Sequence, residues 1–342
     1  MLLKYQINKK IIKKYFLLVK ILKKYILKKI FTGCVSIIIS FIITFFLVKS
    51  APGNPIRMLS GMENPNPELV QHLTVKYGLD KPVLVQFAVY VKNILKGDFG
   101  YSYISDKPVW DIIKARVWPT VILSTSAVIL SMVIGVLIGI YSVRHNNHWQ
   151  DKMLTGVSYV LDSVPGFWLG LILMLIFASG LKILPTSGMF DVRMQYQGFR
   201  YVLDVLKHMI LPLTTLVLIQ APSYYKIFRA NALKTLSEDF VLSIKATGIS
   251  KKGLFYKFVL KNSMLPVITV FGTSIAFSIS GVTLTEIVFS WQGMGRLIID
   301  SISRLDYPVL FGTYLLISIS ICIFTVLTDV FYAFVNPQIK FK

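Results

Sequence analysis

Residues 119–143 read PTVILSTSAVILSMVIGVLIGIYSV, a run that contains no charged side chain. A helix rises about 1.5 Å per residue, so roughly 20 apolar residues are enough to cross the hydrocarbon core of a bilayer. A helix also satisfies its own backbone amide groups where lipid offers no water. This stretch therefore predicts a transmembrane helix.

Five further apolar blocks reach a spanning length. The chain of 342 residues is 54% hydrophobic and 15% charged, with a mean hydropathy of +0.65. Pro212 and Pro222 interrupt one of these blocks. The pattern predicts an all-α polytopic membrane protein with about six transmembrane helices. Their expected ranges are 30–48, 119–143, 153–179, 206–225, 266–290 and 308–335.

The net charge of +21 lies in the segments between these blocks. Six spans place both termini on one side of the membrane. The segments of that side (1–29, 144–152, 226–261 and 336–342) hold 22 basic and 3 acidic residues, against 15 basic and 10 acidic on the other side. Because basic loops favour the cytoplasm, both termini are predicted to be cytoplasmic. The basic residues form no domain of their own, so nucleic acid is not an expected partner.

The N-terminal segment 1–29 contains ten Lys and no acidic residue. Its apolar residues recur at spacings of three and four, which suits a basic amphipathic helix on anionic membrane lipid. A solvated tail that only fixes the orientation is an equally good interpretation. After the first span, 49–117 is an expected extracytoplasmic segment, and 118–335 forms the remaining transmembrane domain. The chain closes on a short cytoplasmic tail, 336–342.

No catalytic or metal-binding pattern stands out. Gly248 and Gly253 have the spacing of a phosphate loop, but Leu254 occupies the place of the Lys that would hold the phosphates. His145 and His148 lack the Glu of a zinc-protease motif. The two cysteines lie in apolar blocks and have no metal or redox spacing. We therefore expect neither an enzyme nor a cofactor or metal site.

The cytoplasmic segment 226–261 is too long for a simple connection between two spans. It predicts two short helices, the first starting near Ser237 and the second covering 251–261, with Gly248 as a cap that tolerates a positive φ. Acidic residues at the start of the first helix suit its positive dipole end. Its apolar side, formed by Phe240, Val241 and Ile244, is predicted to be available to a partner protein.

This segment resembles the EAA-type coupling loop of ABC importer permeases of the dipeptide, oligopeptide and nickel family. The likeness is carried by 239–241 (DFV), 244–248 (IKATG) and 261–266 (KNSMLP). Ile244 stands where the family has a small residue, and Thr247 where it has Lys. By resemblance, the segment docks on a separate cytoplasmic ATPase. The residues expected to make that coupling contact are Glu238, Asp239, Phe240, Val241, Ile244, Lys245, Ala246 and Gly248.

Further motifs of the same family occur in the family's order along the chain. The first external segment contains YGLDKP and GDFGYS, and 286–295 reads EIVFSWQGMG. Gln292 stands where the family has Pro, and Asn336 where it has Asp. The resemblance covers about 25–340. The other matching stretches are 52–55 (PGNP), 165–168 (PGFW), 184–188 (LPTSG), 207–212 (KHMILP) and 336–339 (NPQI).

Three acidic residues lie inside the predicted spans, where an unpaired charge costs several kcal/mol. Glu286 and Asp329 are close to their helix ends and are predicted to anchor at the interface. Asp162 is deeper, and Pro165 just beyond it leaves the Leu161 carbonyl unbonded, which suits a kinked, hydrated place. Asp162 and Pro165 are therefore candidates for the translocation path, with buried packing as the alternative for Asp162.

The resemblance implies a permease subunit of an ATP-driven importer in the bacterial cytoplasmic membrane. Its implied partners are a second homologous permease, two cytoplasmic ATPase subunits and an extracytoplasmic substrate-binding protein. Peptides are the first expected substrate, and nickel or a metal complex is the alternative within the same family. An ion-coupled secondary transporter is the alternative from another class, but it would predict several intramembrane charges and an inverted repeat.

Overall fold

The computed structural model describes residues 2–50, 67–280 and 282–335. Within these ranges the chain is helical, and its only β-type pairing is one isolated bridge between Tyr101 and Pro108. The PGNP motif, the closing NPQI motif and the tail 336–342 lie outside the described residues. The predicted all-α fold is confirmed for the part of the chain that the structure describes.

Five helical stretches are long and apolar enough to cross a membrane, and a bent helix pair makes a sixth candidate. The first half of the chain begins with α1 (Leu2–Ser50), followed by α3 (Pro67–Lys76) and α4 (Val83–Ile94) outside the predicted spans. The second span is α5 (Val109–Arg144). The bent pair joins α6 (Trp149–Ser163) to α7 (Gly166–Leu173) and the π-helical η1 (Met174–Gly180).

The second half of the chain supplies three more spans. The 38-residue helix α8 (Phe199–Leu236) leads to the short α9 (Asp239–Ala246). The next span begins with α10 (Lys251–Leu254) and continues through η2 (Phe255–Val259) and α11 (Leu260–Phe277). Three short elements then precede the last span, α14 (Tyr307–Val335). They are η3 (Ser278–Ser280), α12 (Thr283–Val288) and α13 (Met294–Ser303).

One predicted span is broken at a proline, and another continues through two prolines. The block 153–179 is not one helix: α6 and α7 meet at 102°, with Val164 extended (φ −85°, ψ 127°) before Pro165. A residue before proline disfavours the helical region, so the chain turns there. In contrast, Pro212 and Pro222 lie inside the continuous helix α8. Membrane helices tolerate such prolines, so the predicted interruption is absent.

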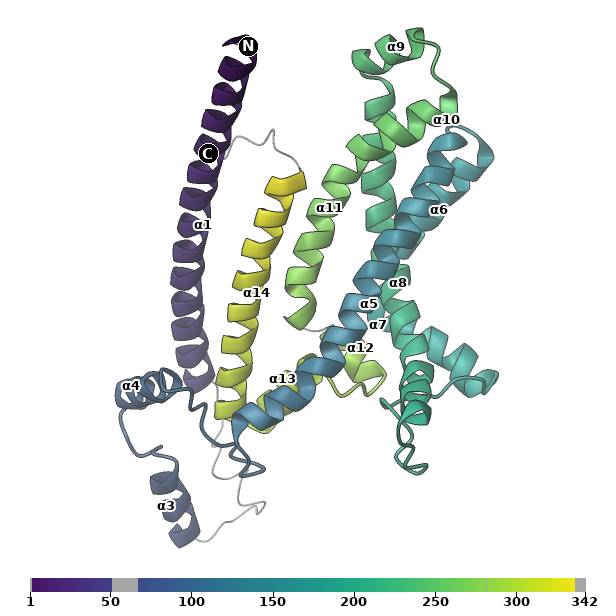
Figure 1. The fold of residues 1–342 in the computed structure, drawn as a ribbon. Coiled ribbons are helices and arrows are strands. Elements are labelled where there is room, and N and C mark those ends of the chain that lie inside the picture. The colour runs from purple at the N-terminus through teal and green to yellow at the C-terminus, as the bar shows by residue number, and fades with distance from the viewer. Residues whose placement is uncertain (1, 51–66, 281, 336–342) are drawn as a thin grey trace.

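Two predicted segment boundaries fall inside helices. The helix α1 continues from Leu2 to Ser50, so the predicted tail 1–29 and the first span are described as one helix. The predicted second coupling helix, 251–261, is the beginning of the span that ends at Phe277 rather than a separate element. Figure 1 shows the start of α1, the end of α14 and α9 near one end of the molecule, with α3, α4 and α13 near the other.

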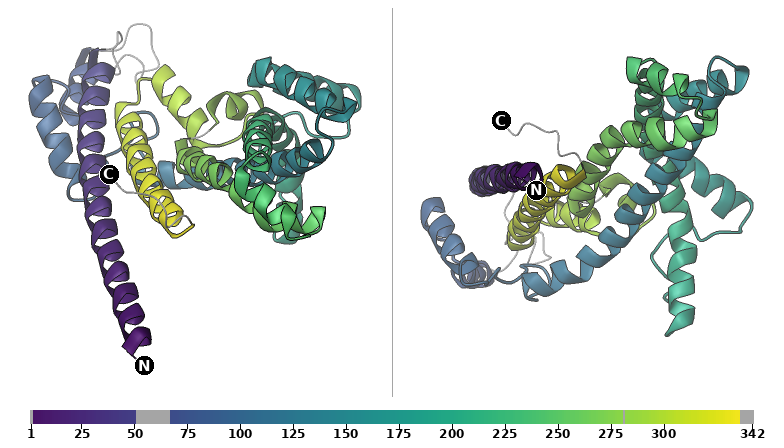
Figure 2. Two further views of the ribbon diagram at one scale, coloured as in Figure 1. Left: turned by 90° about the horizontal axis from the view of Figure 1, so that it is seen from above. Right: turned by 45° about the horizontal axis from the view of Figure 1, so that its top comes forward.

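The centre of the fold is the crossing of α5 and α8. A Cβ at Gly135 would come within 2.6 Å of the Ala221 carbonyl oxygen and 2.9 Å of the Tyr225 amide nitrogen. Only glycine lets the two backbones approach this closely, a common device at membrane helix interfaces. Phe228 is fully buried near the same crossing. On the other side of the molecule α1 packs beside α14 (Figure 2), with the Phe45 and Phe311 ring centroids 4.8 Å apart.

The prediction that Glu286 anchors at the membrane interface is wrong. Its side chain is fully buried, where the Thr120 hydroxyl donates to it over 2.7 Å and the Arg296 amide over 3.0 Å. The Met294 amide in turn donates to the Thr120 oxygen over 2.7 Å. Glu286 lies on α12 rather than at the end of a span. Its hydrogen bonds to Thr120 and Arg296 connect α12 to α5 and α13. The side chain of Asp329 lies outside the described residues.

Candidate coupling site and translocation path

The predicted coupling helix is present as α9. Its N-terminal cap is Glu238, whereas the Ser237 hydroxyl donates to the Lys234 carbonyl and so closes α8. The helix ends at Thr247, and Gly248 follows with φ +78°. Ser250 then caps the next span by accepting a hydrogen bond from the Gly253 amide over 3.1 Å. The predicted first helix and turn therefore form, with Gly248 in the backbone conformation that glycine favours, and the second predicted helix is the start of the next span.

The side chains of α9 divide into a buried and an exposed set. Val241 is fully buried, so its predicted availability to a partner is wrong. Phe240 and Leu242 are 39% and 60% exposed, and Ile244 is half-buried. Val241 therefore holds α9 against the rest of the chain, and Phe240 with Leu242 offers the apolar contact. The remaining predicted coupling residues are exposed: Glu238, Asp239, Lys245, Ala246 and Gly248.

A buried ion pair lies at the base of the coupling segment, and the sequence analysis missed it. Arg229 on α8 donates to both carboxylate oxygens of Asp151 on α6, over 2.7 and 2.6 Å. Asp151 is 2% exposed and also accepts from the Ser142 hydroxyl at the end of α5 and the Asn147 amide. The Tyr225 hydroxyl lies 3.0 Å from the Ser142 hydroxyl. This cluster joins α5, α6 and α8, and we call it the Asp151–Arg229 cluster.

The other side of the coupling segment is held from α5 as well. The Arg144 guanidinium donates to the Tyr256 hydroxyl and lies 5.5 Å from the Phe255 ring centroid. Tyr256 and Phe255 belong to η2, directly after α10. The chain entering α9 and the chain leaving it are therefore both connected to the same end of α5. Contacts on both sides of α9 thus converge on the end of α5.

Asp162, the candidate for the translocation path, is paired with Lys226 of α8. The two side chains are 30% and 36% exposed, and the Lys226 ammonium lies 5.6 Å from the Tyr159 ring centroid. Asp162 therefore has a hydrogen-bonding partner, as the packing alternative expects, and is partly exposed, as the translocation-path prediction expects. Pro165 marks the break between α6 and α7, and a Cβ at Gly166 would lie 2.6 Å from the Ile219 side chain of α8. The break between α6 and α7 and the Asp162–Lys226 pair thus lie along one seam, the contact of α6 and α7 with α8.

A cavity lies beside this seam and shares Ile219 with it. It has a volume of about 400 Å³ and opens between α5, α8, α11 and η3. Gln220 and Ser223 line it from α8, and Ser274 and Ser280 line it from the opposite side. Residues three or four apart share a helix face, so Gln220, Ser223 and Lys226 follow one stripe along α8. Ser223 thus connects the cavity to Lys226, while Asp162 and Lys226 themselves lie outside its lining.

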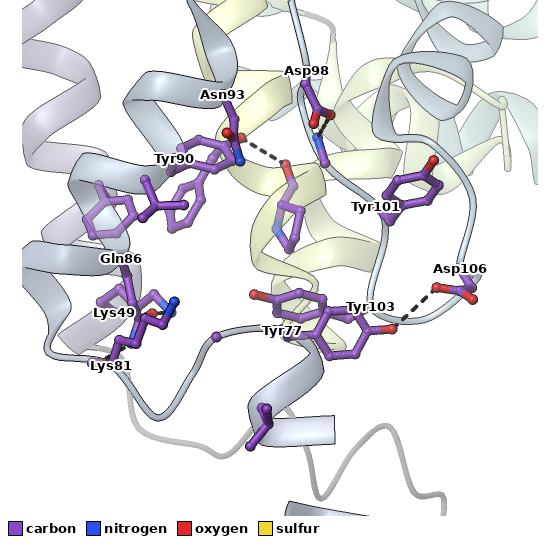
Figure 3. A pocket seen from close by; sticks show the side chains of 17 residues that line it. Lys49, Tyr77, Lys81, Gln86, Tyr90, Asn93, Asp98, Tyr101, Tyr103 and Asp106 are labelled. Atoms are coloured by element: carbon purple, nitrogen blue, oxygen red, sulfur yellow. Dashed lines mark hydrogen bonds between the residues drawn. The ribbon is translucent and has the colours of Figure 1, made fainter. Parts of the chain in front are cut away.

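A second cavity, of about 660 Å³, lies at the opposite end of the molecule from α9 (Figure 3). It brings together the external motifs YGLDKP and GDFGYS with the end of α1 and the start of α14. The Lys49 ammonium donates to the Gln86 amide oxygen over 2.6 Å. Burial raises the pKa of the Tyr90 and Tyr103 hydroxyl groups, so both stay neutral. The two motifs form one site rather than two.

Comparison with known families identifies the class. The profile of the family described as "Binding-protein-dependent transport system inner membrane component" matches residues 131–341, and that of its N-terminal family matches 22–124. The chain belongs to this family. It is accordingly a multi-pass permease subunit of an ABC importer, and ATP hydrolysis lies in separate subunits. A substrate-binding protein and ATPase subunits are its partners.

Among individual proteins, the chain is 34% identical to the glutathione transport system permease protein GsiC of Salmonella typhimurium, over 93% of this chain and 99% of the relative. It is 32% identical to the protein of the same name from Escherichia coli strain K12 over the same shares. A solved structure of the MetNI methionine ABC transporter in an inward-facing conformation matches 66% of this chain and 96% of that chain. The TM-score is 0.52 at 12% identity, which supports the fold alone.

Proposed function

We propose that the chain forms half of the translocation path of an ATP-driven importer of small peptides. Relatives at 32–34% identity transport glutathione, which is itself a tripeptide, and this supports a peptide over nickel. A second homologous permease supplies the other half of the path, two ATPase subunits bind the coupling segments, and an extracytoplasmic protein delivers the solute. Family membership sets aside the ion-coupled secondary transporter.

The coupling role is supported by the exposed surface of α9, which buried contacts hold against the spans. Phe240 and Leu242 are exposed apolar side chains flanked by the exposed acids Glu238 and Asp239. Apolar contacts with a polar rim are typical of a protein interface. Val241 and the Asp151–Arg229 cluster fix this surface to the spans. ATP-driven closure of the ATPases would move α9 in the cytoplasm and alternate the access of the path.

A substitution at Gly248 tests this proposal. Its φ of +78° is unfavourable for a β-branched residue, so Gly248→Val distorts the turn after α9. We expect normal membrane insertion but ATP hydrolysis that no longer drives uptake in proteoliposomes. Gly198→Val is the matched control, because Gly198 also has a positive φ (57°) and open space around it, but lies in the loop before α8. Coupled uptake by Gly248→Val at the level of the control would refute the coupling role.

The substrate is tested on the cognate binding protein. Calorimetry with di- and tripeptides, glutathione and Ni²⁺ compares the two substrate classes on one sample. Peptide binding without Ni²⁺ binding is the expected result. Binding of Ni²⁺ with no response to peptides would overturn the substrate assignment and leave the coupling role of α9 intact.

A further inference from the structure

We propose that the Asp162–Lys226 pair is a charge-exchange site for zwitterionic peptides. Asp162 binds the α-ammonium group of the peptide and Lys226 binds its α-carboxylate. The inference rests on the proposed function, because it assigns a contact on the path of a peptide importer. The observation that carries it is the Asp162–Lys226 contact, which is about a third exposed at a broken span and lies one turn from Ser223 in the lining of a cavity.

The pair lies where the predicted spans meet the predicted cytoplasmic segment 226–261, which begins at Lys226. Lys226 lies ten residues before the end of α8, or about 15 Å along the helix. Asp162 lies next to the break in the bent span. Charged side chains within a bilayer face a cavity or pair with one another, and irregular backbone at that depth is tolerated where it lines a cavity. Asp162 and Lys226 satisfy this rule by pairing, and the break beside Asp162 is the feature that favours a hydrated space here.

The pair is open to that space. About a third of each side chain is exposed, and the Lys226 ammonium makes a cation–π contact with Tyr159, which is itself 59% exposed. Ser223 is exposed one turn away from Lys226 on the same stripe of α8. A deeply buried structural pair, such as Asp151 with Arg229, shows the opposite arrangement, with the acid almost fully covered.

Charge balance explains why a zwitterion suits this site. A solute with one charge that breaks the pair leaves the other member without a partner in the seam between α6 and α8, where it is only partly exposed, and this is unfavourable. A peptide with free termini replaces both partners at once, so no charge stays uncompensated. When the peptide leaves, Asp162 and Lys226 pair again. The site thus favours free peptides over peptides blocked at either end.

The test uses the complete importer in proteoliposomes with its binding protein and a set of peptides. The set contains a free dipeptide, its N-acetylated form and its C-amidated form. For Lys226→Met we expect uptake of the free dipeptide to fall about tenfold relative to the C-amidated form, since about 1.4 kcal/mol corresponds to a factor of ten. Asp162→Asn should produce the same relative loss against the N-acetylated form. The binding protein is the same throughout, so its own preference cancels in each variant-to-wild-type ratio.

A second measurement needs no binding protein. In the purified complex with Cys34 and Cys322 replaced by Ala, Ser223→Cys places a thiol beside the pair. Millimolar free dipeptide should slow alkylation of this thiol by N-ethylmaleimide, and the combined change Asp162→Asn with Lys226→Met should remove this protection. Arg193→Met is the control for uptake, because Arg193 pairs with Asp191 in an exposed loop.

Equal loss of all three peptides in the single variants and in the double variant would show that the pair only stabilises the fold. Unchanged uptake ratios, together with a Ser223→Cys thiol that free dipeptide does not protect from alkylation, would show that the pair does not contact the solute. Either result overturns the inference while wild-type peptide uptake still supports the proposed function. A wild-type importer that takes up no peptide at all would instead refute the proposed function.

Discussion

Replacement of Arg229 by Met should destabilise the protein more than any surface charge change. Arg229 makes two charge-assisted hydrogen bonds of 2.7 and 2.6 Å to Asp151, whose side chain is 3% exposed. Loss of one partner of a buried pair costs about 3–5 kcal/mol, because the remaining charge has no partner. Arg229 itself is 25% exposed, so water replaces part of the contact and we expect about 2–4 kcal/mol.

The order of several variants makes this prediction sharp. For a chain of this size each kcal/mol shifts the melting temperature by roughly 2–4 °C, so Arg229→Met should lower it by about 4–16 °C. Asp151→Asn should cost less, because the unpaired Arg229 reaches water. The double variant should recover part of the loss, since no buried charge remains. Thermal unfolding of the purified complex, with Arg193→Met as an exposed control, provides the measurement. An Arg229→Met shift no larger than that of the control would refute the reasoning.

Three further outcomes follow from the packing. Gly135→Ala should destabilise the α5–α8 crossing by about 1–3 kcal/mol through overpacking, whereas Gly156→Ala, which meets no atom within 4 Å, should be nearly neutral in thermal unfolding. Thr120→Val should lower the free energy of unfolding by about 1–3 kcal/mol, and with it the melting temperature, because the Met294 amide loses its buried acceptor. Leu242→Ala should weaken ATPase binding in a pull-down without a change in melting temperature, a result that a buried Leu242 would not give.

The membrane fold was predictable because bilayer thickness imposes a simple rule on sequence. Five apolar blocks form helices of sufficient length, and the block 153–179 forms a bent pair of helices instead of one span. The effect of each proline was not predictable from its presence alone. One span is broken at Pro165, whereas α8 continues through Pro222. Neighbouring helices decide whether the backbone groups that a proline frees find partners.

The candidate sites were predictable where a local pattern sufficed. The turn at Gly248 required only the backbone preference of glycine, and the helix before it followed from its acidic start, although Ser237 closes α8 instead of capping α9. The burial of Val241 required knowledge of what packs beneath α9. The pairs Asp151–Arg229 and Asp162–Lys226 join residues 78 and 64 positions apart, so no local spacing could reveal them. Glu286 was misassigned because its helix is separate from the span before it.

The central claim is that α9 faces the cytoplasm and is held by the ATPase subunit. The substitution Leu242→Cys, in a chain with Cys34 and Cys322 replaced, tests it directly with a membrane-impermeant maleimide. We predict labelling in inside-out vesicles stripped of ATPase, protection when purified ATPase is added back, and no labelling in right-side-out vesicles. Labelling from the outside, or labelling that added ATPase does not reduce, would contradict the account.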